Sequence, residues 1–213
     1  RVDDNDASEF FSQYWNASLD KIPGLTVVEI MDAACEGRIK GMYVMGENPA
    51  MSDPNLNHAR AGLAALDHLV VQDIFLTETA AYADVVLPAS AFPEKTGTFS
   101  NTDRRVQMGR QALGLPGEAR HDIWIIQQLA ARLGLGWEYD DVSDVFEEMR
   151  GAMPSIAGMT WQRLEQQHSI TYPCAGDQDP GQGVVFQEKF PTADGRGRFV
   201  PAKPESADEM PDE

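Results

Sequence analysis

Cysteine is scarce in this sequence: 213 residues contain two, Cys35 and Cys174. Neither belongs to a Cys-x-x-Cys pair, which excludes a disulfide scaffold, a zinc ribbon and an iron–sulfur cluster held by this sequence alone. The low cysteine count indicates a reducing compartment, and we expect a cytoplasmic protein. Long hydrophobic runs are also missing, since no stretch approaches the roughly 18 apolar residues that a membrane-spanning helix needs.

Positively charged residues are also few. The sequence has 17 Lys and Arg residues but 34 Asp and Glu residues, which gives a formal net charge of −17. An acidic surface repels phosphate backbones and anionic lipid, so we expect no nucleic-acid partner and no membrane insertion. With 42% hydrophobic and 24% charged residues, the composition is that of a globular protein, which excludes a wholly disordered chain.

Common catalytic motifs are absent as well. The sequence contains no Gly-x-Ser-x-Gly elbow, no His-Glu-x-x-His pair, no Walker loop and no Gly-x-Gly-x-x-Gly fingerprint. The four histidines (58, 68, 121 and 168) are scattered, and we do not expect them to ligate a metal. No nucleophile motif therefore stands out in the sequence.

What is present is an alternation of short apolar runs with helical patterns. Strands are expected over 41–45, 69–73 and 84–88, and helices over 26–37, 53–66, 77–82, 122–133, 143–149 and 160–166. Residues 89–120 are expected to form a long loop. Strands that alternate with helices predict an α/β fold with an open, mostly parallel, doubly wound sheet and helices on both faces.

Composition also divides the chain. Residues 1–24 are acidic and aromatic and end in a Pro-Gly turn signal, so we interpret them as a lead-in from a preceding domain. Residues 25–168 form the expected α/β domain. Residues 169–213 are expected to be a linker and the start of a β-rich domain, with strands over 182–190 and 198–200 and a frayed acidic tail.

Polar residues follow the first two expected strands. Gly46, Glu47 and Asn48 come after the first strand, and Gln72 and Asp73 end the second. In an open α/β sheet the carboxyl ends of the strands form the ligand-binding edge. A carboxylate there accepts paired N–H donors from a purine such as guanine.

Two further groups suit an anionic ligand. Thr77 lies near a helix start, where a hydroxyl suits phosphate, and Lys95 supplies a point charge beyond the third strand. Each of these residues taken singly is more simply explained as a turn, a strand-end cap or a solvated lysine. Together they predict a nucleotide-like ligand, whose identity the spacing alone does not give.

Five motifs stand in series along the chain: Met45–Pro49, Val71–Ala80, Ala83–Pro88, Glu94–Gln107 and Pro116–Trp124. This series resembles the molybdopterin oxidoreductases, which carry molybdenum or tungsten on two molybdopterin guanine dinucleotides. Within that family it looks most like the catalytic large subunit of formate dehydrogenases, and two later segments are similar to those enzymes too: Tyr172–Cys174 and Phe190–Phe199.

The resemblance implies a set of cofactor contacts. Asn48, Gln72 and Asp73 match positions that contact one guanine dinucleotide, with Asp73 at the guanine edge. Lys95, in the Glu-Lys-x-Gly motif, and Asp122, which the residues alone indicate only as a helix cap, match two further contacts. Three neighbours complete the expected site: Gly46, Glu47 and Thr77.

The resemblance also implies what belongs to other parts of such an enzyme. The cysteine or selenocysteine that ligates the metal and the cysteines of a 4Fe-4S cluster come earlier in the family, and the final cofactor-binding barrel comes later. We therefore expect a central fragment that alone neither holds the metal nor oxidises formate. The implied whole enzyme oxidises formate to CO2 and passes two electrons, through pterin and iron–sulfur clusters, to iron–sulfur/flavin diaphorase subunits and NAD or another acceptor.

Three alternatives remain open from the sequence. The first is a related enzyme on the same scaffold, such as a nitrate reductase. The second is an electron-transfer subunit of the NADH dehydrogenase type that carries no pterin; the joint presence of Asn48, Asp73, Lys95 and Asp122 argues against it. The third, an unrelated dinucleotide-binding domain, is weakened by the missing glycine fingerprint.

Overall fold

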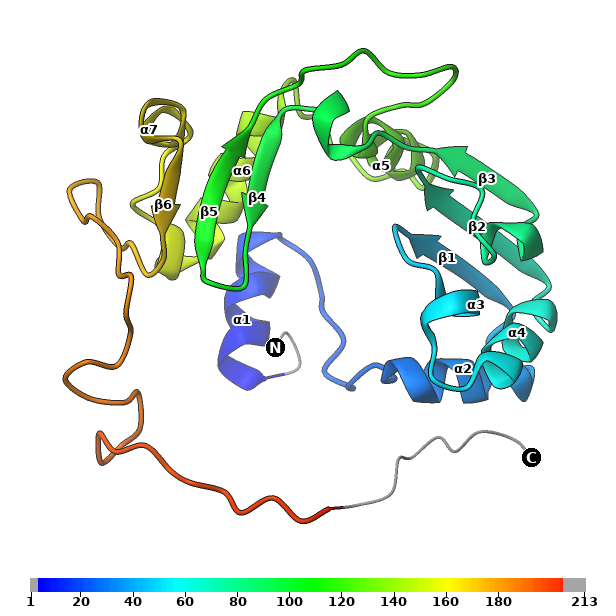
Figure 1. Cartoon of the computed structure of the whole chain (residues 1–213), viewed down its shortest axis with the longest axis horizontal. Coiled ribbons are helices and arrows are strands. Elements are labelled where there is room, and N and C mark those ends of the chain that lie inside the picture. The colour runs from blue at the N-terminus through cyan, green and yellow to red at the C-terminus, as the bar shows by residue number, and fades with distance from the viewer. Residues whose placement is uncertain (1–3, 205–213) are drawn as a thin grey trace. The chain divides into compact units, whose positions relative to one another are not determined.

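The computed structural model describes residues 4–204, which divide into two compact units (Figure 1). The first unit contains residues 4–94 and 114–137, and the second contains residues 95–113 and 138–204. Within this described range, no helix combines the length and hydropathy needed to cross a bilayer. The boundaries drawn from composition, after residues 24 and 168, remain predictions.

The first unit contains a parallel sheet in the order β1-β2-β3. Its strands are β1 (Gly41–Met45), β2 (His68–Asp73) and β3 (Val85–Pro88), which confirms the predicted α/β fold with a parallel sheet. Because side chains alternate between the faces of a strand, Val44, Leu69 and Val71 share one face and pack there with Leu63 in a buried core. Tyr43 lies on the opposite face.

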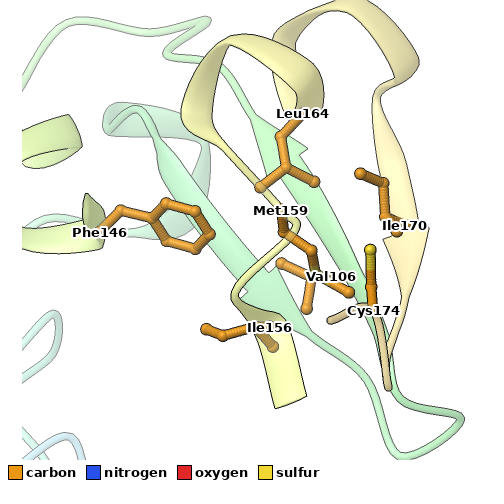
Figure 2. Packing of buried hydrophobic residues seen from close by; sticks show 7 residues of the cluster. All are labelled: Val106, Phe146, Ile156, Met159, Leu164, Ile170 and Cys174. Carbon is orange, nitrogen blue, oxygen red and sulfur yellow. The ribbon is translucent and has the colours of Figure 1, made fainter. Parts of the chain in front are cut away.

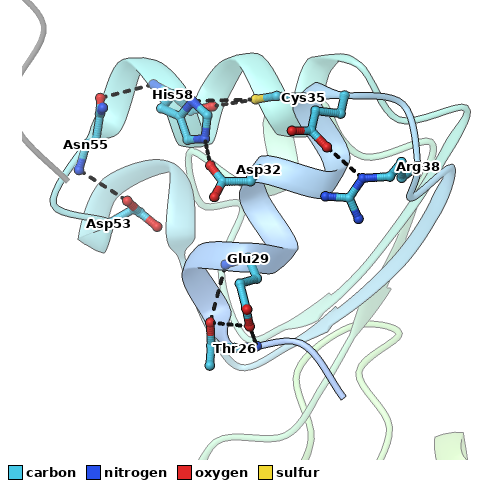
Figure 3. Close-up of polar contacts among 9 residues, drawn as sticks. Thr26, Glu29, Asp32, Cys35, Arg38, Asp53, Asn55 and His58 are labelled. Atoms are coloured by element: carbon cyan, nitrogen blue, oxygen red, sulfur yellow. Dashed lines mark hydrogen bonds and ion pairs between the residues drawn. The ribbon is translucent and has the colours of Figure 1, made fainter. Parts of the chain in front are cut away.

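Five α-helices belong to the first unit: α1 (Asn5–Tyr14), α2 (Val27–Cys35), α3 (Pro49–Ser52), α4 (Leu56–Ala64) and α5 (Asp122–Arg132); the 3-10 turns are η1 (Ala80–Tyr82) and η2 (Phe92–Glu94). The predicted capping box of α2 is present, since Glu29 N–H donates to the Thr26 hydroxyl and Thr26 N–H donates to the Glu29 carboxylate (Figure 3).

Two predictions about these helices were wrong in detail, and one helix was not predicted. Residues 53–66 were expected to form one helix capped by Asp53, but Asn55 is the N-cap of α4 and Asp53 ends α3. The Asp53 carboxylate accepts the Asn55 N–H instead (Figure 3). Asp122 is the first residue of α5 rather than its N-cap, which is His121. The helix α1 was not predicted, although Asp4 caps it with its side chain.

Helices α2 and α4 pack together and share a polar cluster at Asp32, Cys35 and His58 (Figure 3). His58 Nε2 lies 2.9 Å from Asp32 Oδ1, and His58 Nδ1 lies 3.7 Å from Cys35 Sγ. Burial raises the pKa of the Cys35 thiol, and the charges of Asp32 and Glu36 raise it further. The thiol is therefore held in its neutral form, and the cluster links the two helices.

The second unit is built on an antiparallel sheet in the order β4-β5-β6. Its elements are β4 (Gly97–Ser100), β5 (Arg105–Gly109), α6 (Val142–Ala152), η3 (Pro154–Ile156), α7 (Trp161–Gln167) and β6 (Ser169–Thr171). Figure 2 shows its core, where side chains from the sheet and both helices meet: Val106, Phe146, Ile156, Met159, Leu164, Ile170 and Cys174.

The second unit corrects two further expectations. Residues 89–120 were predicted as a loop, but they contain the hairpin of β4 and β5. The strands expected over 182–190 and 198–200 are not formed, and both segments are irregular. The acidic tail predicted to be frayed falls on residues 205–213, which lie outside the described residues.

Candidate functional site

The site is assembled at the carboxyl edge of β1-β2-β3, where the chain leaves β1 at Gly46. Gly46 N–H donates a 2.9 Å hydrogen bond to the Gln72 carbonyl, so this residue remains tied to β2 as the chain turns away. Its φ of +64° is left-handed, a conformation that glycine adopts without strain. A Cβ here would meet open space, so the backbone of Gly46 and the exposed Glu47 are accessible to a ligand.

Asn48 joins the loops that follow β1 and β2. Its Oδ1 accepts hydrogen bonds from the Thr79 N–H at 3.1 Å and the Thr79 hydroxyl at 2.7 Å. Its Nδ2 donates to Glu78 at 2.7 Å, and this bond holds the pKa of the Glu78 carboxyl below its usual range. The Thr79 hydroxyl in turn accepts the buried Ala50 N–H at 3.0 Å. Asn48 therefore fixes the shape of the edge.

Gln72 is the polar centre of the edge and is only 1% exposed. Its Nε2 donates to Asp122 Oδ1 at 2.7 Å, and its Oε1 accepts the hydroxyl proton of Tyr43. Ser90, also buried, donates to Asp122 Oδ2 at 3.4 Å. Burial raises the pKa of Tyr43, and the charge of Asp122 raises it further. The Asp122 carboxylate therefore accepts one hydrogen bond from Gln72 and one from Ser90.

Asp122 reaches this edge because the chain before α5 lies beside the end of β3. Ala89 and Arg120 form a parallel bridge, and Arg120 N–H donates to the Pro88 carbonyl at 3.0 Å. Two residues later α5 begins, so its first residue arrives where β2 and β3 end. An acidic residue in the first turn of a helix is also stabilised by the helix dipole.

Asp73 and Thr77 complete the edge. Asp73 is half-buried at the end of β2, and its Oδ1 accepts the Ile74 N–H at 2.7 Å. The Thr77 hydroxyl accepts the Ala80 N–H at 3.2 Å and so caps η1 locally. Asp73 presents a carboxylate anchored at one oxygen, whereas the hydrogen bond of Thr77 supports the turn.

The structure thus brings seven expected residues to one sheet edge: Gly46, Glu47, Asn48, Gln72, Asp73, Thr77 and Asp122. Lys95 belongs to the second unit, and the edge described here is built from the first unit alone. Sequence reasoning missed Tyr43, Thr79 and Ser90. The sequence held no signal for Tyr43, because the register that pairs Met45 with Gln72 is visible only in the structure.

The chemistry of the edge fits a ligand rich in N–H and O–H donors. Asp73 and Asp122 are carboxylate acceptors, and Gly46 leaves its backbone open to close approach. A guanine base and a ribose both offer such donors. The described residues of this edge therefore fit the nucleotide part of a guanine dinucleotide.

Comparison with known proteins identifies the family. Residues 6–132 match the Molybdopterin oxidoreductase family. The F420-dependent formate dehydrogenase subunit alpha of Methanocaldococcus jannaschii is 45% identical over 209 residues, which cover 97% of this chain and 31% of that protein. The assimilatory nitrate reductase catalytic subunit of Bacillus subtilis is 34% identical over 220 residues, covering 99% of this chain and 31% of that protein.

The fold has a counterpart among solved structures. The acetylene hydratase of Pelobacter acetylenicus superposes with a TM-score of 0.58 at 24% sequence identity, over 68% of this chain and 20% of that one. The chain spans about a third of the length of the curated relatives named above. From the match over residues 6–132, which is more than half of the sequence, the chain belongs to the molybdopterin oxidoreductase family.

Proposed function

We propose that this chain is the cofactor-binding part of a formate dehydrogenase catalytic subunit. The observation that carries the proposal is the 45% identity over 97% of the chain with a formate dehydrogenase alpha subunit. Two further formate dehydrogenase alpha subunits, both from Methanococcus maripaludis, are 41% and 42% identical over similar lengths. The two carboxylates at the sheet edge support the same function, because they suit one molybdopterin guanine dinucleotide.

In this proposal the protein orients the dinucleotide, and the bound metal and pterin supply the two-electron oxidation of formate to CO2. Asp73 and Asp122 accept N–H or O–H donors of the nucleotide, with Asp73 at the guanine edge. Gly46 allows the backbone to approach, and Asn48 and Gln72 keep the loops in place. Glu47, Thr77 and Lys95 are further proposed contacts, with Lys95 as a cation for a phosphate.

The remaining parts of the electron path are proposed for the whole enzyme. A bound molybdenum or tungsten, its pterin and a 4Fe-4S cluster held elsewhere in the enzyme would supply the redox chemistry, and iron–sulfur/flavin subunits in the cytoplasm would be the partners that take up the electrons. The proposed final acceptor is NAD or another acceptor; the M. jannaschii relative is named as F420-dependent. The family's metal ligands lie in parts of the enzyme other than this chain.

A nitrate reductase is the second candidate, favoured by the 34% identity with the B. subtilis enzyme over 99% of the chain. The same cofactor-binding edge would serve either reaction, since both candidates belong to the family matched by residues 6–132. The two candidates therefore differ in substrate and agree in the role of Asp73.

The test uses the whole enzyme that contains this sequence. We expect formate, and not nitrate, to drive electron exchange with a viologen dye, and acid treatment to release GMP from the cofactor. Asp73→Asn should lower the released GMP per enzyme several-fold. Asp67→Asn is the matched control, because Asp67 is exposed just before β2, at the opposite end of the strand. Nitrate-dependent activity without formate-dependent activity overturns the choice of substrate, and unchanged GMP content in Asp73→Asn overturns the nucleotide contact.

A further inference from the structure

Tyr43 and Gln72 are diagonal neighbours on one face of the sheet. Tyr43 is in register with Val70, two residues before Gln72, so both side chains leave the sheet on the same side. Tyr43 is 41% exposed, whereas Gln72 is buried. A buried amide must find partners for both its oxygen and its nitrogen, because leaving either unpaired costs free energy.

The partners of Gln72 fix which way its amide points. The Asp122 carboxylate only accepts hydrogen bonds when it is ionised, so the Gln72 nitrogen must face it, as it does at 2.7 Å. The Gln72 oxygen then faces Tyr43, whose hydroxyl donates its proton. Ser90 donates to the other oxygen of Asp122. The chain of donors runs in one direction, from Tyr43 through Gln72 to Asp122.

We propose that Tyr43, Gln72 and Ser90 are positioning residues that hold the Asp122 carboxylate oriented toward the donors of a bound nucleotide. The inference rests on the proposed function, since it assigns a role to the neighbours of a proposed contact. Tyr43 acts through Gln72, and Ser90 acts directly on Asp122. Without these donors the Asp122 carboxylate loses two of its hydrogen bonds, and a nucleotide meets a less well oriented acceptor.

The first test measures GDP binding to the 213-residue chain by calorimetry, with the thermal unfolding midpoint recorded for each variant. Tyr43→Phe removes one hydroxyl and keeps the ring, so we expect the midpoint to change by a few degrees at most and GDP affinity to fall about five- to tenfold. Tyr82→Phe is the control, because Tyr82 is similarly exposed at 38% and lies on η1. Equal GDP affinity in the parent and in Tyr43→Phe overturns the inference.

A second test separates a positioning role from a purely structural one. Gln72→Glu places two carboxylates side by side, and we expect both the midpoint and the GDP affinity to fall. Adding Asp122→Asn to Gln72→Glu lets the new amide at position 122 donate a hydrogen bond to the new carboxylate at position 72, the reverse of the parent arrangement. The unfolding midpoint should therefore recover, while the GDP affinity stays low.

Recovery of both quantities in the double variant means that the nucleotide does not sense the Asp122 charge, and the inference fails. A parent chain that is folded but binds no GDP overturns the proposed nucleotide site itself. The failure of the positioning role is thereby distinguished from the failure of the function on which it rests.

Discussion

Gln72 Nε2 and Asp122 Oδ1 lie 2.7 Å apart, a hydrogen bond between side chains separated by 50 positions in the sequence. The bond joins the end of β2 to the start of α5. Because Gln72 is buried and Asp122 is half-buried, neither group exchanges this partner easily for water. The candidate site therefore depends on a long-range contact within the first unit.

Replacing Gln72 tests how much this contact contributes to the free energy of unfolding. Gln72→Leu is close in size but leaves the Tyr43 hydroxyl and one oxygen of Asp122 without the amide. We expect the free energy of unfolding to fall by about 1–3 kcal/mol. Urea unfolding followed by circular dichroism measures this value, with Gln166→Leu on the exposed surface of α7 as the control. Equal losses in the two variants would contradict the prediction.

Thr79 is a buried residue whose hydrogen bonds stabilise the loop that contains Asn48. Its side chain is 0% exposed, and its hydroxyl both donates to Asn48 and accepts the Ala50 N–H. Thr79→Val keeps the shape and removes the hydroxyl, so the buried Ala50 N–H loses its acceptor. We expect a loss of about 1–3 kcal/mol in the free energy of unfolding. Thr102→Val, at an exposed turn, should change the same quantity by less than about 0.5 kcal/mol.

The buried core of the second unit allows a separate prediction about stability. Leu164 on α7 is fully buried among Val106, Met159 and Ile170 (Figure 2). Leu164→Ala removes buried methyl groups and leaves a cavity, which should cost about 2–5 kcal/mol. Leu113→Ala, where the parent side chain is 57% exposed, is the control. A destabilisation no larger than that of the control would show that this cluster does not stabilise the unit.

The Asp179 carboxylate accepts two backbone hydrogen bonds within its own loop. Hydrogen bonds from the Gly181 N–H at 2.9 Å and the Ala175 N–H at 3.0 Å lower the pKa of the Asp179 carboxyl from its ordinary value of 3.8. A carboxyl whose folded pKa is lowered stabilises the protein above its unfolded pKa, and this contribution disappears as the pH falls through the folded pKa.

We therefore expect parent and Asp179→Asn to differ in unfolding midpoint at pH 6 and to converge as the pH is lowered below about 4. Thermal unfolding at a series of pH values measures the difference. Asp177→Asn, in the same loop, is the control, because Asp177 receives neither of these hydrogen bonds. A difference that is constant between pH 6 and pH 3 would exclude the ionised carboxylate as its source.

The parallel sheet was predictable because local signals specify it. Each strand is a short apolar run ended by Gly46, Asp73 or Pro88, and neighbours in sequence are neighbours in the sheet. The antiparallel sheet was missed because β4 and β5 carry polar residues and are joined by a turn of Asn, Thr, Asp and Arg. Their third strand, β6, is three residues long and follows β5 by about sixty positions, so no local pattern pairs them.

The candidate site was likewise predictable where local sequence signals specify it and was missed where long-range contacts decide. Asn48, Gln72 and Asp73 could be predicted as site residues because they lie at or just after strand ends. In open α/β sheets, ligands bind at the carboxyl ends of the strands. Asp122 looks like an ordinary helix cap, because its contact with Gln72 depends on how the chain returns beside β3. Tyr43 was missed because an aromatic residue in a buried strand indicates core packing. In the structure its hydroxyl instead donates a hydrogen bond to the Gln72 side chain.

The most direct test of the central claim is the thermal unfolding midpoint of this chain with and without GDP. A ligand that binds only the folded state raises the midpoint. A guanine site at the sheet edge predicts a rise with millimolar GDP, no comparable rise with ADP, and loss of the GDP effect in Asp73→Asn. Equal shifts with GDP and ADP, or a GDP shift that survives Asp73→Asn, would contradict the assignment of the guanine base to Asp73.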